Sequence, residues 1–129
     1  MVSTGLAAAG FKFVNLDAGV WLPNRSAAGQ LQPDPSKFPS GLHALAARLH
    51  QSGLTLGLYT DLSSRAVGKV CGTGPGSFGH FDDDAEAIVG YGAGFVKVDY
   101  CACKSLDAFF SISFFLSRFI RNPIKTASR

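Results

Sequence analysis

The chain of 129 residues is long enough to bury one hydrophobic core but is short for many enzymes. Its content of 47% hydrophobic and 16% charged residues indicates a globular segment, and a net charge of +3 without a long basic run argues against nucleic-acid binding. No stretch approaches the roughly 20 apolar residues of a membrane span. The densest apolar run, residues 108–116, is too short and contains serines.

The start of the chain, residues 1–10, lacks the charged beginning and the long apolar centre of a signal peptide. We expect these residues to form part of an amphipathic helix. The next segment, Phe11–Leu16, is apolar and leads into Asp17. This pattern predicts a strand at about 11–17 that ends on a carboxylate.

A polar loop then leads to a segment in which leucine and alanine recur at helical spacing. The spacing predicts a helix over about 41–52, with Ser40 as its N-cap and Gly53 at its end. The second predicted strand, at about 54–60, leads into Asp61. A glycine-rich loop occupies residues 68–79.

Three acids, Asp82 to Asp84, begin a second predicted helix, where we expect them to complement the helix dipole. The third predicted strand, at about 94–99, reads as buried and ends on Asp99. Burying an ionised carboxylate is costly, so an Asp at the end of an apolar strand is either paired or functional.

The order β–α–β–α–β predicts a parallel sheet with right-handed crossovers. A Rossmann-like sheet would need a G-x-G-x-x-G sequence directly after a strand. The glycines at 72–76 lie well past a strand and are interrupted by Pro75. A (β/α)8 barrel places its chemistry at the C-terminal strand ends, where Asp17, Asp61 and Asp99 are expected. We therefore predict an α/β fold, a fragment of a (β/α)8 barrel with about three βα units.

The chain contains three cysteines, Cys71, Cys101 and Cys103. They form no CxxC pair and no histidine cluster accompanies them, so we expect no zinc site. Two alternatives stay open from spacing alone: three free buried thiols, or one disulfide and one free thiol in an oxidising compartment. A glycosylation sequon at Asn24–Arg25–Ser26 agrees with a secretory route.

Five segments resemble, in their order and spacing, the α-galactosidases and α-N-acetylgalactosaminidases of glycoside hydrolase family 27. They are residues 10–17, residues 34–41, residues 53–61, Cys71 together with residues 75–79, and Lys97–Val98–Asp99–Tyr100–Cys101. The resemblance covers about residues 1–107 and implies a partial (β/α)8 catalytic domain. Residues 108–129, which are Phe-rich and then basic, resemble nothing in the family.

The resemblance implies a retaining glycosidase that cleaves terminal α-D-galactosyl residues from oligosaccharides or glycoconjugates. By its place in the Lys-x-Asp-x-Cys motif, Asp99 resembles the nucleophile. Lys97 points to the same face of the strand, and a nearby cation favours the ionised carboxylate. Without the family match, the alternative is an Asp that only caps the next helix.

The resemblance also assigns sugar contacts. It implies that Asp17 accepts hydrogen bonds from sugar hydroxyls, that Lys97 donates to a hydroxyl, and that Tyr59 is a wall or a donor. The alternative for Tyr59 is core packing. Trp21 either stacks on a sugar face or packs, and the sequence does not separate these two roles.

Further properties follow from the resemblance alone. It implies a disulfide between Cys71 and Cys101, with Cys103 as a free thiol, and it implies no cofactor and no metal. It implies a secreted or a lysosome- or vacuole-like location, and homo-oligomers occur among family members. The choice between galactose and N-acetylgalactosamine depends on residues that the family places beyond this segment.

The chain departs from the family pattern at two places. The family's first matching strand ends in two adjacent Asp residues followed by Cys and Trp, whereas here Asp17 is followed by Ala18, Gly19 and Val20 before Trp21. The family's second catalytic carboxyl, the acid/base, lies beyond the nucleophile strand, and we expect it to be missing from this chain. Two hypotheses therefore remain: part of an α-galactosidase, or an inactive remnant that is at best a weak sugar-binding module.

Overall fold

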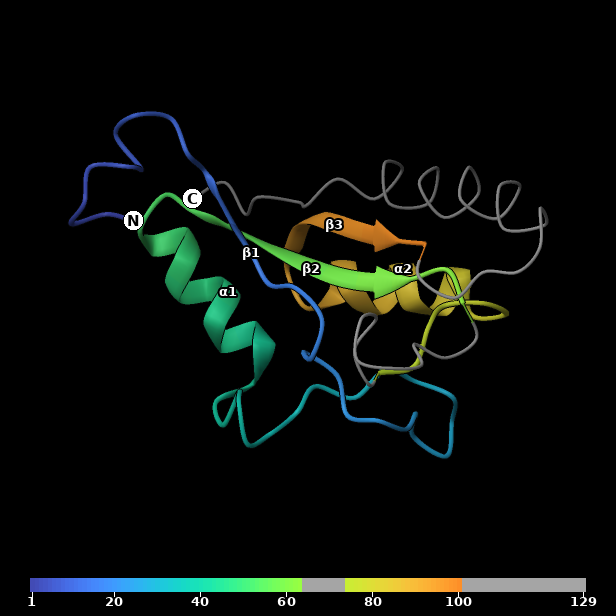
Figure 1. The fold of residues 1–129 in the computed structure, drawn as a ribbon. Helices are drawn as coiled ribbons and strands as arrows, with labels where there is room; N and C mark the ends of the chain where they lie inside the picture. The colour runs from blue at the N-terminus through green and yellow to red at the C-terminus, as the bar shows by residue number, and fades with distance from the viewer. Residues whose placement is uncertain (64–73, 101–129) are drawn as a thin grey trace.

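The computed structural model describes residues 1–63 and 74–100. These residues form three strands and two helices that alternate along the chain (Figure 1). The elements are β1 (Phe13–Asn15), α1 (Gly41–Gln51), β2 (Thr55–Asp61), α2 (Phe81–Gly90) and β3 (Ala93–Asp99). The alternation predicted from the sequence is confirmed.

The three strands form one parallel sheet in the order β1-β2-β3. The first pair places Phe13 opposite Thr55, and the second pair runs to its end with Asp61 opposite Asp99. The carboxyl ends of β2 and β3 therefore meet at one edge, as expected for parallel strands joined by helical crossovers.

Helix α1 forms where apolar residues recur at helical spacing, and its buried positions are Leu42 and Ala46. The helix occupies the predicted segment, and its C-terminus is closed by a Schellman pair of hydrogen bonds. In this pair the Gly53 amide donates to the His50 carbonyl and the Leu54 amide to the Leu49 carbonyl, each at 2.9 Å. Ser40 occupies the N-cap position, but its side chain makes no capping hydrogen bond.

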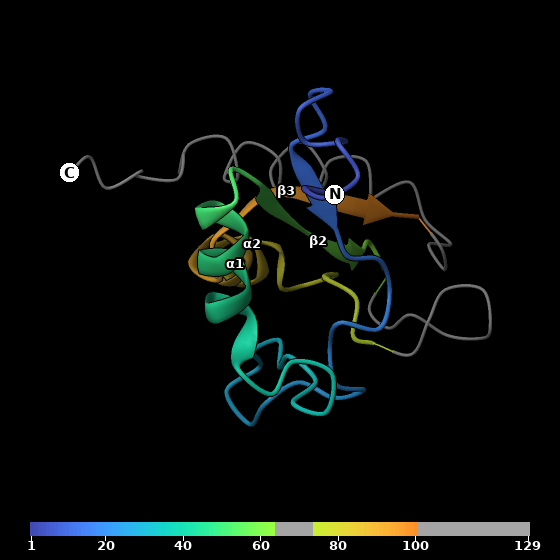
Figure 2. The ribbon, with the colours of Figure 1, turned by 90° about the vertical axis from the view of Figure 1, so that its left-hand side faces the viewer.

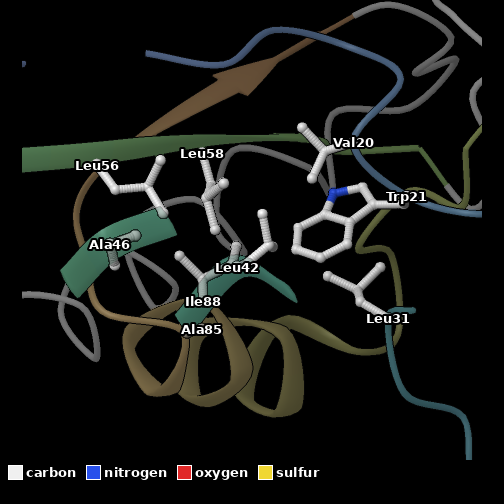
Figure 3. Close-up of a cluster of buried hydrophobic side chains, with 10 residues drawn as sticks. Val20, Trp21, Leu31, Leu42, Ala46, Leu56, Leu58, Ala85 and Ile88 are labelled. Carbon is white, nitrogen blue, oxygen red and sulfur yellow. The ribbon is translucent and has the colours of Figure 1, made fainter. Parts of the chain in front are cut away.

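Both helices cover the same face of the sheet, and the core lies between the helices and the sheet (Figure 2). Leu56 and Leu58 of β2 lie two residues apart on one face of the strand and belong to the same buried cluster as residues of both helices. The long loop between β1 and α1 extends this core by Val20, Trp21 and Leu31 (Figure 3). Neither helix is long and apolar enough to cross a membrane, within the ranges that the structure describes.

The opposite face of the sheet carries exposed aromatic side chains. Phe13 is 47% exposed and Phe95 is 40% exposed, and their ring centroids lie 5.8 Å apart. In β3 only Ala93 is fully buried. The sequence-based expectation of a buried third strand is therefore wrong for one of its two faces, because the described helices cover the other face only.

Residues 1–10 do not form the helix expected from their amphipathic pattern. They form successive turns, in which the Gly5 amide donates to the Val2 carbonyl at 3.2 Å. Gly5 has φ of +75°. This left-handed conformation interrupts a right-handed helix and accounts for the difference. The first strand is also shorter than predicted, with Phe13–Asn15 in place of 11–17.

Candidate active site

Lys97 lies at the centre of a polar cluster on the face of the sheet away from the helices. Its Nζ donates to Asp17 Oδ2 at 2.9 Å, and it lies 3.8 Å from Asp99 Oδ2. The same ammonium lies 5.2 Å from the centroid of the Tyr59 ring. The structure thus brings together four of the residues predicted for the site, namely Asp17, Tyr59, Lys97 and Asp99.

The strands explain this gathering. Tyr59 and Lys97 face each other in the register of β2 and β3, and Asp99 follows Lys97 by two residues on the same face. Asp17 lies two residues beyond the end of β1. The parallel arrangement therefore brings chain segments about 80 residues apart to one edge of the sheet.

The Asp99 carboxylate is held by two donors and remains open to solvent. The Tyr59 hydroxyl donates to Asp99 Oδ2 at 3.3 Å, and the Tyr100 amide donates to Oδ1 at 2.8 Å. The side chain is 38% exposed. A ligand can therefore reach the Asp99 carboxylate from the face of the sheet that the two helices do not cover.

The charges of the cluster are fixed by these contacts. The hydrogen bond from Lys97, followed by that from the Ala18 amide, holds the pKa of Asp17 below its usual range. The same contact with Asp17 raises the pKa of Lys97. Burial, followed by the negative charge of Asp99, raises the pKa of Tyr59. At neutral pH the cluster therefore contains a carboxylate at Asp17, an ammonium at Lys97 and a neutral phenol at Tyr59.

Asp61 has different surroundings, although it lies opposite Asp99 in the sheet. Its side chain is 1% exposed, and Oδ1 accepts hydrogen bonds from the Ser63 amide at 2.7 Å and from the Ser63 hydroxyl. Its carboxylate therefore holds the turn after β2. Of the three strand-end carboxylates, those of Asp17 and Asp99 lie together beside Lys97, whereas that of Asp61 is buried.

Trp21 lies in the core. It is 5% exposed, its Nε1 donates to the Tyr59 carbonyl at 2.9 Å, and its ring lies 5.9 Å from that of Tyr91. This placement favours the packing role over stacking on a sugar. Through Trp21, the loop after β1 is attached to the strand that carries Tyr59.

The sequence analysis missed a buried ion pair between Arg25 and Asp84. We expected Asp84 to complement the dipole of α2, but it is 1% exposed and pairs with Arg25 at 2.7 Å. Asp84 and the buried Ile88 are four residues apart, so both lie on the inner face of α2. That spacing was the available signal, because an acid on the buried side of a helix needs a partner.

Several other predictions fall outside the described residues. Cys71, Cys101, Cys103 and the tail at 108–129 belong to this group. The disulfide between Cys71 and Cys101 therefore stays a prediction, as does the boundary at residue 107.

Comparisons with known protein sequences and structures identify relatives of this chain. The family model described as alpha galactosidase A matches residues 1–122. Among curated proteins, the chain is 40% identical over 107 residues to human alpha-galactosidase A and 45% identical over 102 residues to alpha-galactosidase of Coffea arabica. These matches cover 83% and 78% of this chain but 24% and 26% of the relatives, so the chain spans about a quarter of their length.

Solved structures give the same result for the fold. Alpha-galactosidase I from Mortierella vinacea matches with a TM-score of 0.83 at 27% identity, covering 95% of this chain and 32% of that one. Alpha-galactosidase from Saccharomyces cerevisiae matches with a TM-score of 0.80 at 26% identity, covering 93% and 27%. The three parallel strands and two helices thus correspond to part of an α-galactosidase barrel, and the chain belongs to the α-galactosidase family, glycoside hydrolase family 27.

Proposed function

We propose that this chain forms the nucleophile-bearing part of a retaining α-galactosidase site that binds a terminal α-D-galactosyl residue. The observation that supports this most directly is the Asp17–Lys97–Asp99 cluster with Tyr59 beside it. The cluster joins acceptors and donors at the carboxyl edge of a parallel sheet, the edge at which barrel enzymes carry their chemistry. Such a set is suited to a ligand with several hydroxyl groups.

In this proposal Asp99 attacks the anomeric carbon of the bound sugar. The bond to the leaving oxygen breaks while a second carboxyl protonates that oxygen, and an ester between the sugar and Asp99 forms. The second carboxyl, now deprotonated, takes a proton from a water molecule, which attacks the same carbon, releases Asp99 and gives a sugar of the original configuration. The Lys97 ammonium lies 3.8 Å from the carboxylate of this proposed nucleophile.

The other members of the cluster hold the sugar. Asp17, kept ionised by Lys97, accepts hydrogen bonds from two neighbouring hydroxyls, and the Lys97 ammonium donates to one of them. Tyr59 donates to Asp99 in the free protein at 3.3 Å and orients the carboxylate that attacks. Galactose is the sugar favoured here, with N-acetylgalactosamine as the competing choice.

A second candidate function, sugar binding without turnover, is supported by the carboxyls that the structure describes near Asp99. A general acid needs a raised pKa, but the pKa of Asp17 is lowered. Asp61 is buried and bonded to its own turn. Neither residue is suited to protonate a leaving group, so we expect the chain alone to bind galactose without hydrolysing galactosides.

Two measurements on the full chain test this expectation. Titration with D-galactose, followed by NMR, should shift the amide signals of Tyr59, Lys97 and Asp99, whereas D-glucose, which differs at one hydroxyl, should shift them less. Hydrolysis of p-nitrophenyl α-D-galactopyranoside should be negligible. Turnover that disappears in Asp99→Asn would show instead that the chain is a complete enzyme.

The nucleophile is tested in a chimaera in which residues 1–107 replace the matching segment of the coffee α-galactosidase. We expect release of p-nitrophenol from the α-galactoside that is lost in Asp99→Gly and restored by added azide. Azide then takes the place of Asp99 and forms a β-galactosyl azide, whereas rescue of an acid/base variant would give the α-anomer. Full activity of the Asp99→Gly chimaera would exclude Asp99 as the nucleophile, and Asp83→Gly is the matched control.

A further inference from the structure

Arg25 and Asp84 form a bidentate ion pair outside the Lys97 cluster, in which Asp84 is buried and Arg25 is largely buried. Arg25 Nη1 donates to Asp84 Oδ1 and Nη2 donates to Oδ2, each at 2.7 Å. The side chains are 13% and 1% exposed. Arg25 also donates from Nη1 to the Gly29 carbonyl at 2.8 Å and from Nη2 to the Gly76 carbonyl at 2.7 Å.

These four hydrogen bonds join three separate parts of the chain. Arg25 and Gly29 belong to the loop between β1 and α1, Asp84 lies in the first turn of α2, and Gly76 lies in the segment that precedes α2. A planar guanidinium offers its donors in a fixed fork, so it sets directions as well as distances. The pair therefore holds these three parts in one relative position.

The segment held at Gly76 lies directly against the end of β2. The Ser77 amide donates to the Asp61 carbonyl at 2.7 Å, and the Ser77 and Thr60 hydroxyls are 2.5 Å apart. The Phe78 amide donates to the Ser63 carbonyl at 3.1 Å. The approach is close, because a Cβ added at Gly76 would lie 1.9 Å from the Ser63 oxygen.

The end of β2 in turn holds the backbone of Asp99. The Leu62 amide donates to the Asp99 carbonyl at 3.0 Å, and Asp61 lies opposite Asp99 in the register. The Tyr100 amide then holds the Asp99 carboxylate. A continuous series of hydrogen bonds therefore leads from Arg25 through Gly76 and β2 to Asp99.

We propose that Arg25 and Asp84 are positioning residues for Asp99, which fix the end of β2 and through it the orientation of the Asp99 backbone and carboxylate. The catalytic role of Asp99 rests on the proposed function. The dependence of the Asp99 position on the Arg25–Asp84 pair does not. Apolar residues of similar volume often replace a buried ion pair without loss of stability. What they do not replace is the directed hydrogen bond to the Gly76 carbonyl.

The test compares two variants of the full chain by NMR and by urea unfolding. In Arg25→Met/Asp84→Leu the core stays filled, and we expect an unfolding midpoint equal to or above that of the natural chain. In Arg25→Lys the charge stays but the fork is lost. In both variants we expect the Leu62 and Tyr100 amide protons to move upfield and to exchange with solvent at least about tenfold faster. Arg48→Met, which removes an exposed arginine of α1, is the control and should leave both signals unchanged.

The outcomes separate the positioning role from a structural one. Unchanged Leu62 and Tyr100 signals in either folded variant would overturn the proposal. If the double variant does not fold, Arg25→Lys decides the question in the same way. Failure of the chain to bind galactose would refute the proposed function and leave these two amide signals, and therefore this inference, unaffected.

Discussion

The Tyr59 hydroxyl donates a hydrogen bond to Asp99 across the boundary between β2 and β3, with 3.3 Å between Oη and Oδ2. The main-chain carbonyl of Tyr59 accepts the indole N–H of Trp21 at 2.9 Å. One residue thus contacts the proposed nucleophile with its side chain and the core with its backbone. The position of Asp99 is therefore coupled to the packing of the loop after β1.

This contact predicts a loss of stability at high pH. Burial raises the pKa of Tyr59 above 10.0, so the folded state holds the phenol proton more tightly than the unfolded state. The contribution of the neutral Tyr59 phenol to the free energy of unfolding is fully present below pH 10.0. It is lost as the pH rises towards the pKa of the folded state, by up to about 1.4 kcal/mol for each pH unit. Unfolding in urea between pH 8 and 11, followed by the fluorescence of Trp21, measures this change in the free energy of unfolding. Tyr59→Phe should show a shallower decline. The remainder is due to Tyr91, whose pKa burial raises, and to Lys97, whose pKa the hydrogen bond with Asp17 raises. Equal slopes in the two proteins would contradict the prediction.

Asp17→Asn should weaken galactose binding while leaving the fold almost unchanged. The ion pair with Lys97 is exposed, at 68% for Asp17, and such pairs contribute about 0–1 kcal/mol to stability. A hydrogen bond between a charged group and a sugar hydroxyl is worth roughly 1.5–3 kcal/mol, or about 10- to 150-fold in affinity. NMR titration measures the affinity and urea unfolding the stability. Asp83→Asn removes the same charge from the exposed side of α2 and should leave affinity unchanged. An affinity for Asp17→Asn equal to that of the control would remove Asp17 from the site.

Gly76→Ala should destabilise the chain, because its Cβ would lie 1.9 Å from the main-chain oxygen of Ser63 and the backbone must shift. Overpacking of this kind costs typically about 1–3 kcal/mol. Gly90→Ala is the matched control, since a Cβ at this helical position meets no atom within 4 Å. The control should gain about 0.4–1 kcal/mol from the reduced entropy of the unfolded chain. The measurement is the difference between the free energies of unfolding of the two variants. Equal values would show that the backbone at Gly76 can shift without a loss of stability.

Removal of one partner of the buried pair should be far more costly than replacement of both. Asp84→Ala leaves the Arg25 guanidinium buried without its carboxylate, and breaking such a pair costs about 3–5 kcal/mol. Asp83→Ala, one residue earlier and exposed, should change the free energy of unfolding by less than about 0.5 kcal/mol. Chemical denaturation of the two variants gives the comparison. A small effect of Asp84→Ala would mean that water or another group reaches Arg25.

Local patterns in the sequence predicted the elements that depend on them. Helix α1 and strands β2 and β3 lie within one or two residues of their predicted positions, because each combines apolar periodicity with a terminating residue such as Gly53 or Asp61. The gathering of Asp17 and Asp99 followed from one rule, that the carboxyl ends of parallel strands share an edge.

The features that were missed or left open depend on contacts between distant residues. Asp84 is bound by a side chain 59 residues away, which no local pattern contains. The burial of Trp21 depends on the backbone of Tyr59, 38 residues along the chain. Strand β3 looks buried when its apolar residues are counted, but which of its two faces is covered depends on where both helices pack.

The order of the strands in space has a consequence for synthesis. Each strand pairs with the one made before it, so β2 can pair with β1, and β3 with β2, as the chain leaves the ribosome. Pairing each strand with its predecessor closes a smaller loop than pairing β3 with β1 would, and chains fold from their N-terminal part during translation. The carboxylate that ends β3 thus reaches a partly assembled sheet, in which Tyr59 has already been made.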